Sequence, residues 1–390
     1  MKLKITTAIV LLLTGCFTSY SQTKKDSIPF SELKQRINDK LKQGGIVGVG
    51  AAIIDNKKTT WMKGFGYSDK ENQLPFTPST VMNIASISKT FTGFCIMKAV
   101  EEGKLSLDEN INTYLPFKII NPNFPEEKIT LRHLATHTSS LTDRYPFYSD
   151  STMYEVTKTP EKLGTFLKSY FVPGGKHYLL ENFLNHKPGT FREYSNFGAG
   201  LAGYIVELQT GLSLENYARK MIFKPLGMKS TTWSYQKSKL KNYTKLYHKD
   251  RNGIQSIPLY HGVTYPDGGI RTSVEDLSKF YVCLLNDGVY NSKTILKKEL
   301  AQELMRFQFT ESNKPTNVNL KKLNSGIFWA TKNNAIKIGH NGTDPGVRTF
   351  MLSDLEKKRG IILFFNTSLE EEKDELNYYE IFDLLDLTKF

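Results

Sequence analysis

The chain reads Ser86-Ile87-Ser88-Lys89 at the start of an apolar segment that continues to Val100. Its apolar residues recur with the spacing of one buried helical face, and Gly103 is well placed to end the helix. A helix puts the Ser86 hydroxyl and the Lys89 amine one turn apart on the same side. Because the positive end of the helix favours developing negative charge, this arrangement can activate Ser86 as a nucleophile.

The Ser-x-x-Lys spacing alone is weak evidence for a catalytic pair. It also occurs at Ser31-Lys34, Ser234-Lys237 and Ser238-Lys241. The last two pairs lie among lysines in a predicted loop, whereas Ser86 precedes a buried helix. Context therefore singles out Ser86 and Lys89, although a lysine with its ordinary pKa of about 10.4 is a poor base unless its surroundings lower that value.

A second motif, Tyr194-Ser195-Asn196, follows the turn signal Lys187-Pro188-Gly189 and precedes a small-residue helix expected from Gly198 to Leu208. We expect the motif at a loop tip. A tyrosine beside a lysine can pass protons, and an asparagine amide can orient that lysine and bind a substrate carbonyl or amide. A turn tyrosine with a capping asparagine is the structural alternative.

A third motif, His340-Asn341-Gly342, is expected to follow a strand from Ala335 to Gly339. Glycine permits the backbone to approach a ligand closely. The backbone N–H groups of Thr343 and Ser86 can then form a two-donor pocket for the oxyanion of an acyl-transfer reaction. A glycine-rich turn with a surface histidine is the structural alternative.

In this order, the three motifs resemble those of the serine β-lactamase and penicillin-binding protein superfamily. The chain also resembles the class C branch of this superfamily over about residues 30 to 370. The segments that carry this resemblance are Glu102–Asp108, Tyr114–Pro116, Ile129–Ser139, Pro188–Asn196 and Asp267–Leu277. The resemblance implies an α+β fold, in which an antiparallel sheet flanked by helices meets a helical subdomain and the site lies in the cleft between them.

The resemblance also implies roles for individual residues. Ser86 would be the nucleophile, Lys89 and Tyr194 the acid/base pair, and Asn196 the residue that orients substrate and lysine. His340, with Gly342, would contribute the third motif. Which of Lys89 and Tyr194 takes the first proton is left open by the sequence.

Three departures from the family pattern bear on the substrate. Ser140 replaces a glycine, and Asp267 stands where a small residue often precedes Gly-Gly; both are expected to reshape the cleft rim. His340 replaces the lysine of true class C β-lactamases and resembles the peptidase and esterase members. Losing a fixed cation weakens recognition of the β-lactam carboxylate, so β-lactams rank second as substrates.

Strand signals at both ends of the chain predict one sheet from about residues 44–66 and 326–366, with a mainly helical insert at about 86–300. A terminal helix is expected from about Glu370. The whole of 22–390 is expected to form a single domain. Within the insert, Thr142 to Lys187 is rich in Tyr and Phe and is expected either to wall the cleft or to pack locally.

The N-terminus has the layout of a secretory signal, with Lys2 and Lys4 before an apolar run too short to span a bilayer. The sequence leaves two alternative processing sites. Leu13-Thr14-Gly15-Cys16 resembles a lipobox, which would remove residues 1–15 and leave Cys16 as a lipid attachment site on the membrane. Cleavage after Ser21 would instead remove residues 1–21. We therefore expect an exported protein of the periplasm or cell envelope, or a secreted one.

The chain carries 52 Lys and Arg against 39 acidic residues, a net charge of +13, but only ten of the 52 are Arg. Arginine is the residue that reads phosphates and guanine bidentately. The lysines are scattered, so we expect a solvated cationic surface and no nucleic-acid partner.

Cys95 and Cys283 lie in apolar segments and are expected to be buried free thiols.

Two other enzyme classes fit poorly. His133 and His137 have the i, i+4 spacing of a helical zinc site, but the glutamate that a metalloprotease needs is replaced by Leu134. No Gly-x-Ser-x-Gly elbow of an α/β-hydrolase is present.

We expect a serine hydrolase of D-amino-acyl peptides or small esters and amides, without metal or cofactor. A penicillin-binding sensor that acylates slowly is the non-enzymatic alternative. Oligomeric state leaves no readable signal.

Overall fold

A computed structural model describes residues 29–155, 160–234 and 242–388 of the chain. Its main sheet has the strand order β12-β13-β14-β15-β1-β2-β3, and every neighbouring pair is antiparallel. The strands are β1 (Gly48–Asp55), β2 (Lys58–Asp69), β3 (Leu74–Pro75), β12 (Ala330–Lys332), β13 (Lys337–Asp344), β14 (Val347–Asp354) and β15 (Arg359–Phe365). The predicted antiparallel sheet from the two ends of the chain is confirmed.

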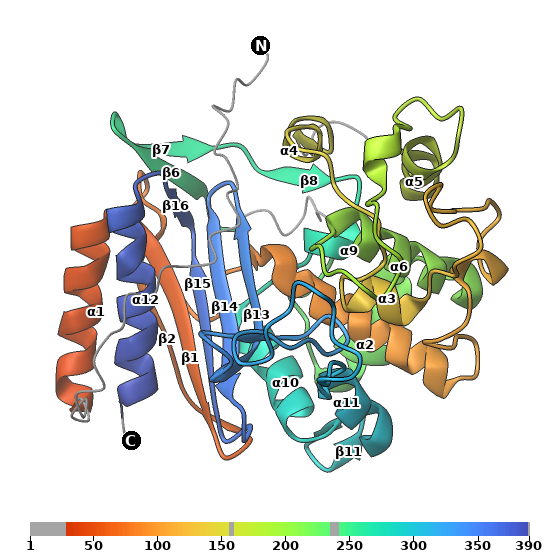
Figure 1. Cartoon of the computed structure of the whole chain (residues 1–390). Coiled ribbons are helices and arrows are strands. Elements are labelled where there is room, and N and C mark those ends of the chain that lie inside the picture. The colour runs from red at the N-terminus through yellow and green to blue at the C-terminus, as the bar shows by residue number, and fades with distance from the viewer. Residues whose placement is uncertain (1–28, 156–159, 235–241, 389–390) are drawn as a thin grey trace.

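Helices cover both faces of this sheet (Figure 1). Helices α1 (Phe30–Gly44) and α12 (Glu372–Leu387) lie side by side on one face, although they come from opposite ends of the chain. The other face carries the remaining helical layer. The predicted terminal helix is thus present and begins at Glu372.

The central strand β1 is buried on both faces. Ala51 and Ile53 belong to the apolar cluster beneath α1 and α12, whereas Ala52 and Ile54 belong to the cluster under the helical layer. Successive side chains of a strand point to opposite faces, so a strand covered on both sides needs apolar residues at nearly every position. The uninterrupted apolar run in β1 meets that requirement.

Helix α2 (Ser88–Glu101) is buried nearly all round, not on the single face that its spacing predicted. It contacts α6, α7, α9 and α11, which surround it. The other helices are α3 (Leu131–Ala135), α4 (Phe147–Ser151), α5 (Leu163–Phe171), α6 (Asn196–Thr210), α7 (Leu214–Ala218), α8 (Lys224–Leu226), α9 (Tyr265–Gly268), α10 (Val274–Leu285) and α11 (Lys298–Met305).

The predicted helical insert also contains short strands. Among them, β6 and β7 form a hairpin whose turn includes Asn252. Strand β4 precedes the insert, and β16, which pairs with β6 in parallel, follows it. The bounds are β4 (Met82–Asn83), β5 (Met153–Glu155), β6 (Leu246–Asp250), β7 (Gly253–Ile257), β8 (Tyr260–Gly262), β9 (Arg271–Thr272), β10 (Val289–Tyr290), β11 (Lys293–Thr294) and β16 (Thr367–Leu369).

Several features expected at the N-terminus and in one loop lie outside the described residues. These are the signal segment with Cys16, and Lys237, Ser238 and Lys241 of the lysine-rich loop. Within the described ranges, no helix combines the length and the hydropathy needed to span a lipid bilayer. Cys95 and Cys283 are buried and free, as predicted.

A stacked aromatic pair joins α2 to α10. The ring centroids of Phe91 and Phe280 lie 3.8 Å apart, and both side chains are fully buried. We expect Phe280→Ala to lower the free energy of unfolding by about 3–5 kcal/mol, because it removes this contact and leaves a cavity. Urea denaturation measures the change, with the exposed Leu376→Ala of α12 as the control. Equal stabilities of the two variants would contradict the packing role.

Candidate active site

Ser86 lies in a 3₁₀ turn, Ala85–Ile87, that leads directly into α2. Ala85 adopts a positive φ of 47°, a conformation that costs energy for a residue with a Cβ. Two hydrogen bonds fix the turn: the Ala85 N–H donates to Asn83 Oδ1 at 2.7 Å, and the Thr349 hydroxyl donates to the Ile84 carbonyl at 3.0 Å. Ser86 is therefore held on a rigid turn, where it stays partly exposed while its neighbours are buried.

Lys89 is fully buried, and its Nζ contacts three oxygens. It donates to Ser86 Oγ at 3.1 Å, to Asn196 Oδ1 at 2.7 Å and to the backbone carbonyl of Asp267 at 2.9 Å. A lysine ammonium has three N–H donors, so these acceptors satisfy it. The structure thus brings together the first two predicted motifs.

The charge state of Lys89 follows from its neighbours. Burial by itself lowers the pKa of Lys89. The electrostatic interactions of the ammonium with Tyr194, Asp267 and Asp143 together outweigh burial, so the net effect is a raised pKa. Lys89 is therefore an ammonium in the resting site. This is the opposite of the lowered pKa that a lysine base requires.

Tyr194 and His340 face the same site. The Tyr194 ring lies 4.9 Å from Lys89 Nζ, and its centroid is 6.4 Å from that of His340. Burial first, and then the charges of Lys332 and Lys89, lower the pKa of His340 well below its usual value. His340 is accordingly neutral, and its Nδ1 lies 2.7 Å from the Asn341 carbonyl oxygen.

The third motif lies within strand β13, not after it as predicted. Strand β13 passes so close to the nucleophile turn that a Cβ on Gly342 would lie 2.5 Å from the Ile84 carbonyl oxygen. Only glycine permits this approach, as expected from the motif. Thr343 follows on the same strand, one residue beyond this contact with the turn.

The second motif lies at the start of α6, where Ser195 and Asn196 are buried and Tyr194 is half-buried, so it is not an exposed loop tip. The Ser195 side chain, not Asn196, caps the helix by accepting from the Gly198 N–H at 2.9 Å. Asp143 fixes this helix start: it accepts from the Ser195 hydroxyl at 2.8 Å and from the backbone N–H groups of Asn196 at 2.6 Å and Phe197 at 3.0 Å. Sequence reasoning missed Asp143, since no local pattern marks it.

His137 is a second residue that the sequence did not assign to the site. Helix α3 ends at Ala135, and His137 adopts a positive φ beyond it, so His133 and His137 do not share a helical face. Instead the His137 ring packs on Tyr194 at 4.3 Å, and its Nδ1 accepts from the Ser195 N–H at 3.2 Å. Within the described ranges, no group of three or more His, Cys, Asp or Glu residues is arranged to hold a metal ion.

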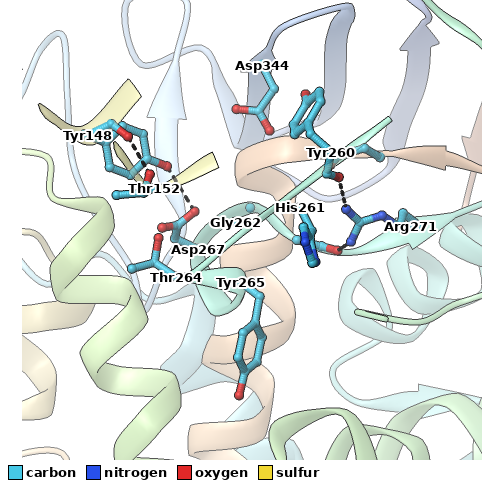
Figure 2. Close-up of a pocket in the computed structure, with 13 residues that line it drawn as sticks. Tyr148, Thr152, Tyr260, His261, Gly262, Thr264, Tyr265, Asp267, Arg271 and Asp344 are labelled. Carbon is cyan, nitrogen blue, oxygen red and sulfur yellow. Dashed lines mark hydrogen bonds between the residues drawn. The ribbon is translucent and has the colours of Figure 1, made fainter. Parts of the chain in front are cut away.

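Ser140 and Asp267, the two positions expected to reshape the cleft rim, are both buried. Ser140 has a positive φ of 61°, which explains why glycine suits this position in relatives, and its hydroxyl donates to the His186 carbonyl. Asp267 is only 4% exposed and accepts from the Tyr148 hydroxyl at 3.2 Å (Figure 2). Residues of the Tyr- and Phe-rich segment do both things expected of it. Tyr148 lines this pocket, whereas Phe166 and Tyr170 pack locally against Phe197.

Asp344, at the end of β13, lines the same pocket as Asp267 (Figure 2). Burial raises the pKa of Asp267 to about 6, against the opposing charge of Lys89. Burial and then the charge of Asp267 raise the pKa of Asp344 to about 7. Sequence reasoning missed Asp344, although it lies only two residues beyond the third motif.

A family model described as Beta-lactamase matches residues 33–386, nearly the whole chain. The chain belongs to the β-lactamase family. Protein flp of Staphylococcus aureus is 29% identical over 355 residues, which are 90% of this chain and 64% of flp. This chain therefore spans less than two thirds of the length of that relative.

Solved structures share the fold of this chain. The octameric penicillin-binding protein homologue from Pyrococcus abyssi aligns with a TM-score of 0.71 and 26% identity, covering 92% of this chain and 78% of that one. The D-amino acid amidase from Ochrobactrum anthropi aligns with a TM-score of 0.69 and 21% identity, covering 91% and 98%. Membership of this family supports the general class of serine hydrolase.

The two pocket carboxyls predict how stability depends on pH. Asp344 binds its proton more tightly in the folded chain than in the unfolded chain, so its ionisation from about pH 4 to pH 7 lowers the free energy of unfolding. We expect the stability of the wild type, measured by urea denaturation relative to Asp344→Asn, to fall over this window. Asp39→Asn on the exposed side of α1 is the charge control. A pH-independent difference between wild type and Asp344→Asn would contradict the assignment.

Proposed function

We propose that the chain is an exported serine hydrolase that cleaves amides or esters through an acyl-enzyme on Ser86. One observation carries the proposal: Lys89 Nζ lies within hydrogen-bond distance of both Ser86 Oγ and Asn196 Oδ1, with the Tyr194 ring 4.9 Å away. Burying a lysine is costly, and a pure binding module has no need for one beside an accessible serine. Export rests on the N-terminal sequence, with Cys16 as the proposed lipid site or cleavage after Ser21.

Tyr194 is the proposed general base. An ammonium has no lone pair to accept a proton, and the raised pKa of Lys89 keeps it in that form. The positive charge of Lys89 instead favours negative charge that develops on a neighbouring oxygen during proton transfer. As the general base, the side-chain oxygen of Tyr194 takes the hydroxyl proton of Ser86 while Oγ forms a bond to the substrate carbonyl carbon.

The tetrahedral intermediate then breaks down toward the acyl-enzyme. Its oxyanion is to be held by the backbone N–H groups of Ser86 and Thr343. Tyr194 returns the proton to the leaving nitrogen or oxygen as the bond from that atom to carbon breaks. In the second half, Tyr194 takes a proton from water, the resulting hydroxide attacks the acyl carbon, and Ser86 is released with its proton restored.

Strand β13 supports a peptide-like substrate. Strand β12 pairs only with Lys337–Gly339, so the segment from His340 to Asp344 has no strand partner on that edge among the described residues. An extended peptide can add to such an edge through backbone hydrogen bonds. D-amino-acyl peptides and small amides or esters are the proposed substrates, and the fold shared with a D-amino acid amidase agrees with this choice.

β-Lactams rank second, because the neutral His340 supplies no fixed positive charge for their carboxylate. A third function is a sensor that is acylated but released slowly. Labelling of Ser86 without turnover of any ester, D-peptide or lactam would favour the sensor.

Labelling with a fluorophosphonate tests the nucleophile. We expect Ser86→Ala to abolish covalent labelling of the mature protein, because Ser86 has an activating lysine and tyrosine beside it. Ser31→Ala is the matched control, since Ser31 and Lys34 share the spacing but are exposed on α1. Gel fluorescence and intact mass measure the label. Equal labelling of Ser86→Ala and wild type would refute the assignment.

The base is tested separately. We expect Tyr194→Phe to lower kcat on an activated ester about 10²- to 10⁴-fold, since the phenol that moves the proton is lost while the ring is retained. Tyr67→Phe, at a 42% exposed tyrosine, is the control. Steady-state kinetics measure the change. A Tyr194→Phe enzyme with wild-type kcat would mean that another group takes the proton.

A further inference from the structure

Tyr145 lies at the edge of the site, and the proposed proton transfers do not use it. The residue is 51% exposed, yet its hydroxyl lies 3.4 Å from Asn196 Nδ2, which donates to it. Burial raises the pKa of this hydroxyl, and the charges of Asp143 and Tyr194 raise it further, so Tyr145 stays a neutral phenol. The tip of the side chain is therefore enclosed beside the reacting groups, and the ring accounts for the exposed surface.

Hydrogen bonds in series connect Tyr145 to the nucleophile. Asn196 Nδ2 donates to Tyr145, and Asn196 Oδ1 accepts from Lys89 at 2.7 Å. Lys89 in turn donates to Ser86 Oγ at 3.1 Å. A side-chain amide has two N–H donors, and the Tyr145 hydroxyl is the one acceptor that Nδ2 meets in the described part of the chain. The other N–H is left for a carbonyl of the substrate, whose neighbouring group then lies next to the Tyr145 ring.

The backbone that leads into Tyr145 is anchored. The Arg144 N–H donates to the Tyr170 hydroxyl at 3.1 Å, and the Arg144 guanidinium donates to Asn182 Oδ1 at 2.6 Å. One residue earlier, Asp143 accepts from the backbone at the start of α6. Two consecutive residues before Tyr145 are thus fixed, so the direction in which Tyr145 leaves the backbone is set before a substrate binds.

The ring of Tyr145 also has a fixed support. It meets the Tyr148 ring edge to face, with the centroids 5.7 Å apart. The Tyr148 ring packs on Phe197 in the same manner at 5.4 Å, and the Tyr148 hydroxyl donates to Asp267. A ligand that contacts a side chain already held in place causes little further loss of conformational entropy.

A single exposed tyrosine is ordinary on a protein surface. Tyr67 of β2 is such a residue: it is 42% exposed and lies toward the opposite edge of the main sheet from β13. Tyr145 differs because its hydroxyl accepts from Asn196, which itself contacts Lys89. Contact with Asn196, and not exposure alone, therefore assigns Tyr145 to the site.

We propose that Tyr145 is a substrate-contacting residue whose ring packs on an aromatic group of the substrate near the scissile bond. The inference rests on the proposed function and narrows its substrates to amides or esters that carry such a group. Aromatic pairs in offset-stacked or edge-to-face geometry gain energy beyond the burial of their area, so an aromatic ring is favoured over a saturated ring of equal size. The group can belong to the acyl part or to the leaving group, and the test has an arm for each.

Matched esters test the inference. The acyl arm compares ethyl phenylacetate with ethyl cyclohexylacetate, and the leaving-group arm compares benzyl acetate with cyclohexylmethyl acetate. Chromatography of the released acid or alcohol gives kcat/KM. We expect the aromatic-to-saturated ratio of kcat/KM in one arm to be about 3- to 10-fold higher in the wild type than in Tyr145→Leu, which keeps apolar bulk but has no ring.

Two further variants serve as controls. Tyr145→Phe keeps the ring and should retain the wild-type ratio, as should Tyr67→Leu at the other exposed tyrosine. Equal ratios in the wild type and Tyr145→Leu in both arms would overturn the inference. A Tyr145→Phe enzyme with the low ratio of Tyr145→Leu would also overturn it, because the hydroxyl would then act through Asn196 and the ring would contact no substrate.

Fluorophosphonate labelling of the same samples separates this inference from the proposed function, and labelling of each variant shows that its site is formed. Absence of label on wild-type Ser86 defeats the hydrolase proposal itself. A labelled enzyme whose ratios do not respond to Tyr145→Leu defeats only the aromatic contact. If no ester is hydrolysed, protection against labelling gives the same ratios, with phenylacetamide against cyclohexylacetamide and N-benzylacetamide against N-(cyclohexylmethyl)acetamide.

Discussion

The buried ammonium of Lys89 is the constraint on which the site depends. A buried charge is tolerated only when hydrogen-bond acceptors surround it. Lys89 donates to three acceptors: the Ser86 hydroxyl one helical turn away, and the Asn196 side chain and the Asp267 carbonyl, which lie far along the chain. Helices α2, α6 and α9 must therefore keep one relative position. The same requirement sets Tyr194, just before α6, against the nucleophile.

The sheet supplies the other half of the geometry. Strand β13 passes against the turn before Ser86 because Gly342 has no side chain, and His340 lies two residues before this contact on the same strand. His340 is neutral and its ring faces that of Tyr194. The proposed oxyanion donor Thr343 follows Gly342 directly on the same strand.

Local patterns in the sequence predicted the fold and the motifs that carry the site. Strand signals at both ends of the chain predicted the sheet, and helical spacing placed Ser86 beside Lys89. Partners that lie far apart in the chain were missed, because no short pattern marks them. Asp143 anchors Asn196 across 53 residues, and His137 packs on Tyr194. The raised pKa of Lys89 was also beyond the sequence, since it depends on charges brought near only by folding.

The most direct test is a crystal structure of the mature protein trapped as a covalent acyl adduct. We expect the acyl carbon on Ser86 Oγ and the carbonyl oxygen about 2.7–3.1 Å from the backbone nitrogens of both Ser86 and Thr343. The Tyr194 hydroxyl should lie within hydrogen-bond distance of Ser86 Oγ. An adduct on another residue, or a carbonyl oxygen turned away from Thr343 with Tyr194 remote from Ser86, would contradict the convergence of these groups on one reacting carbon.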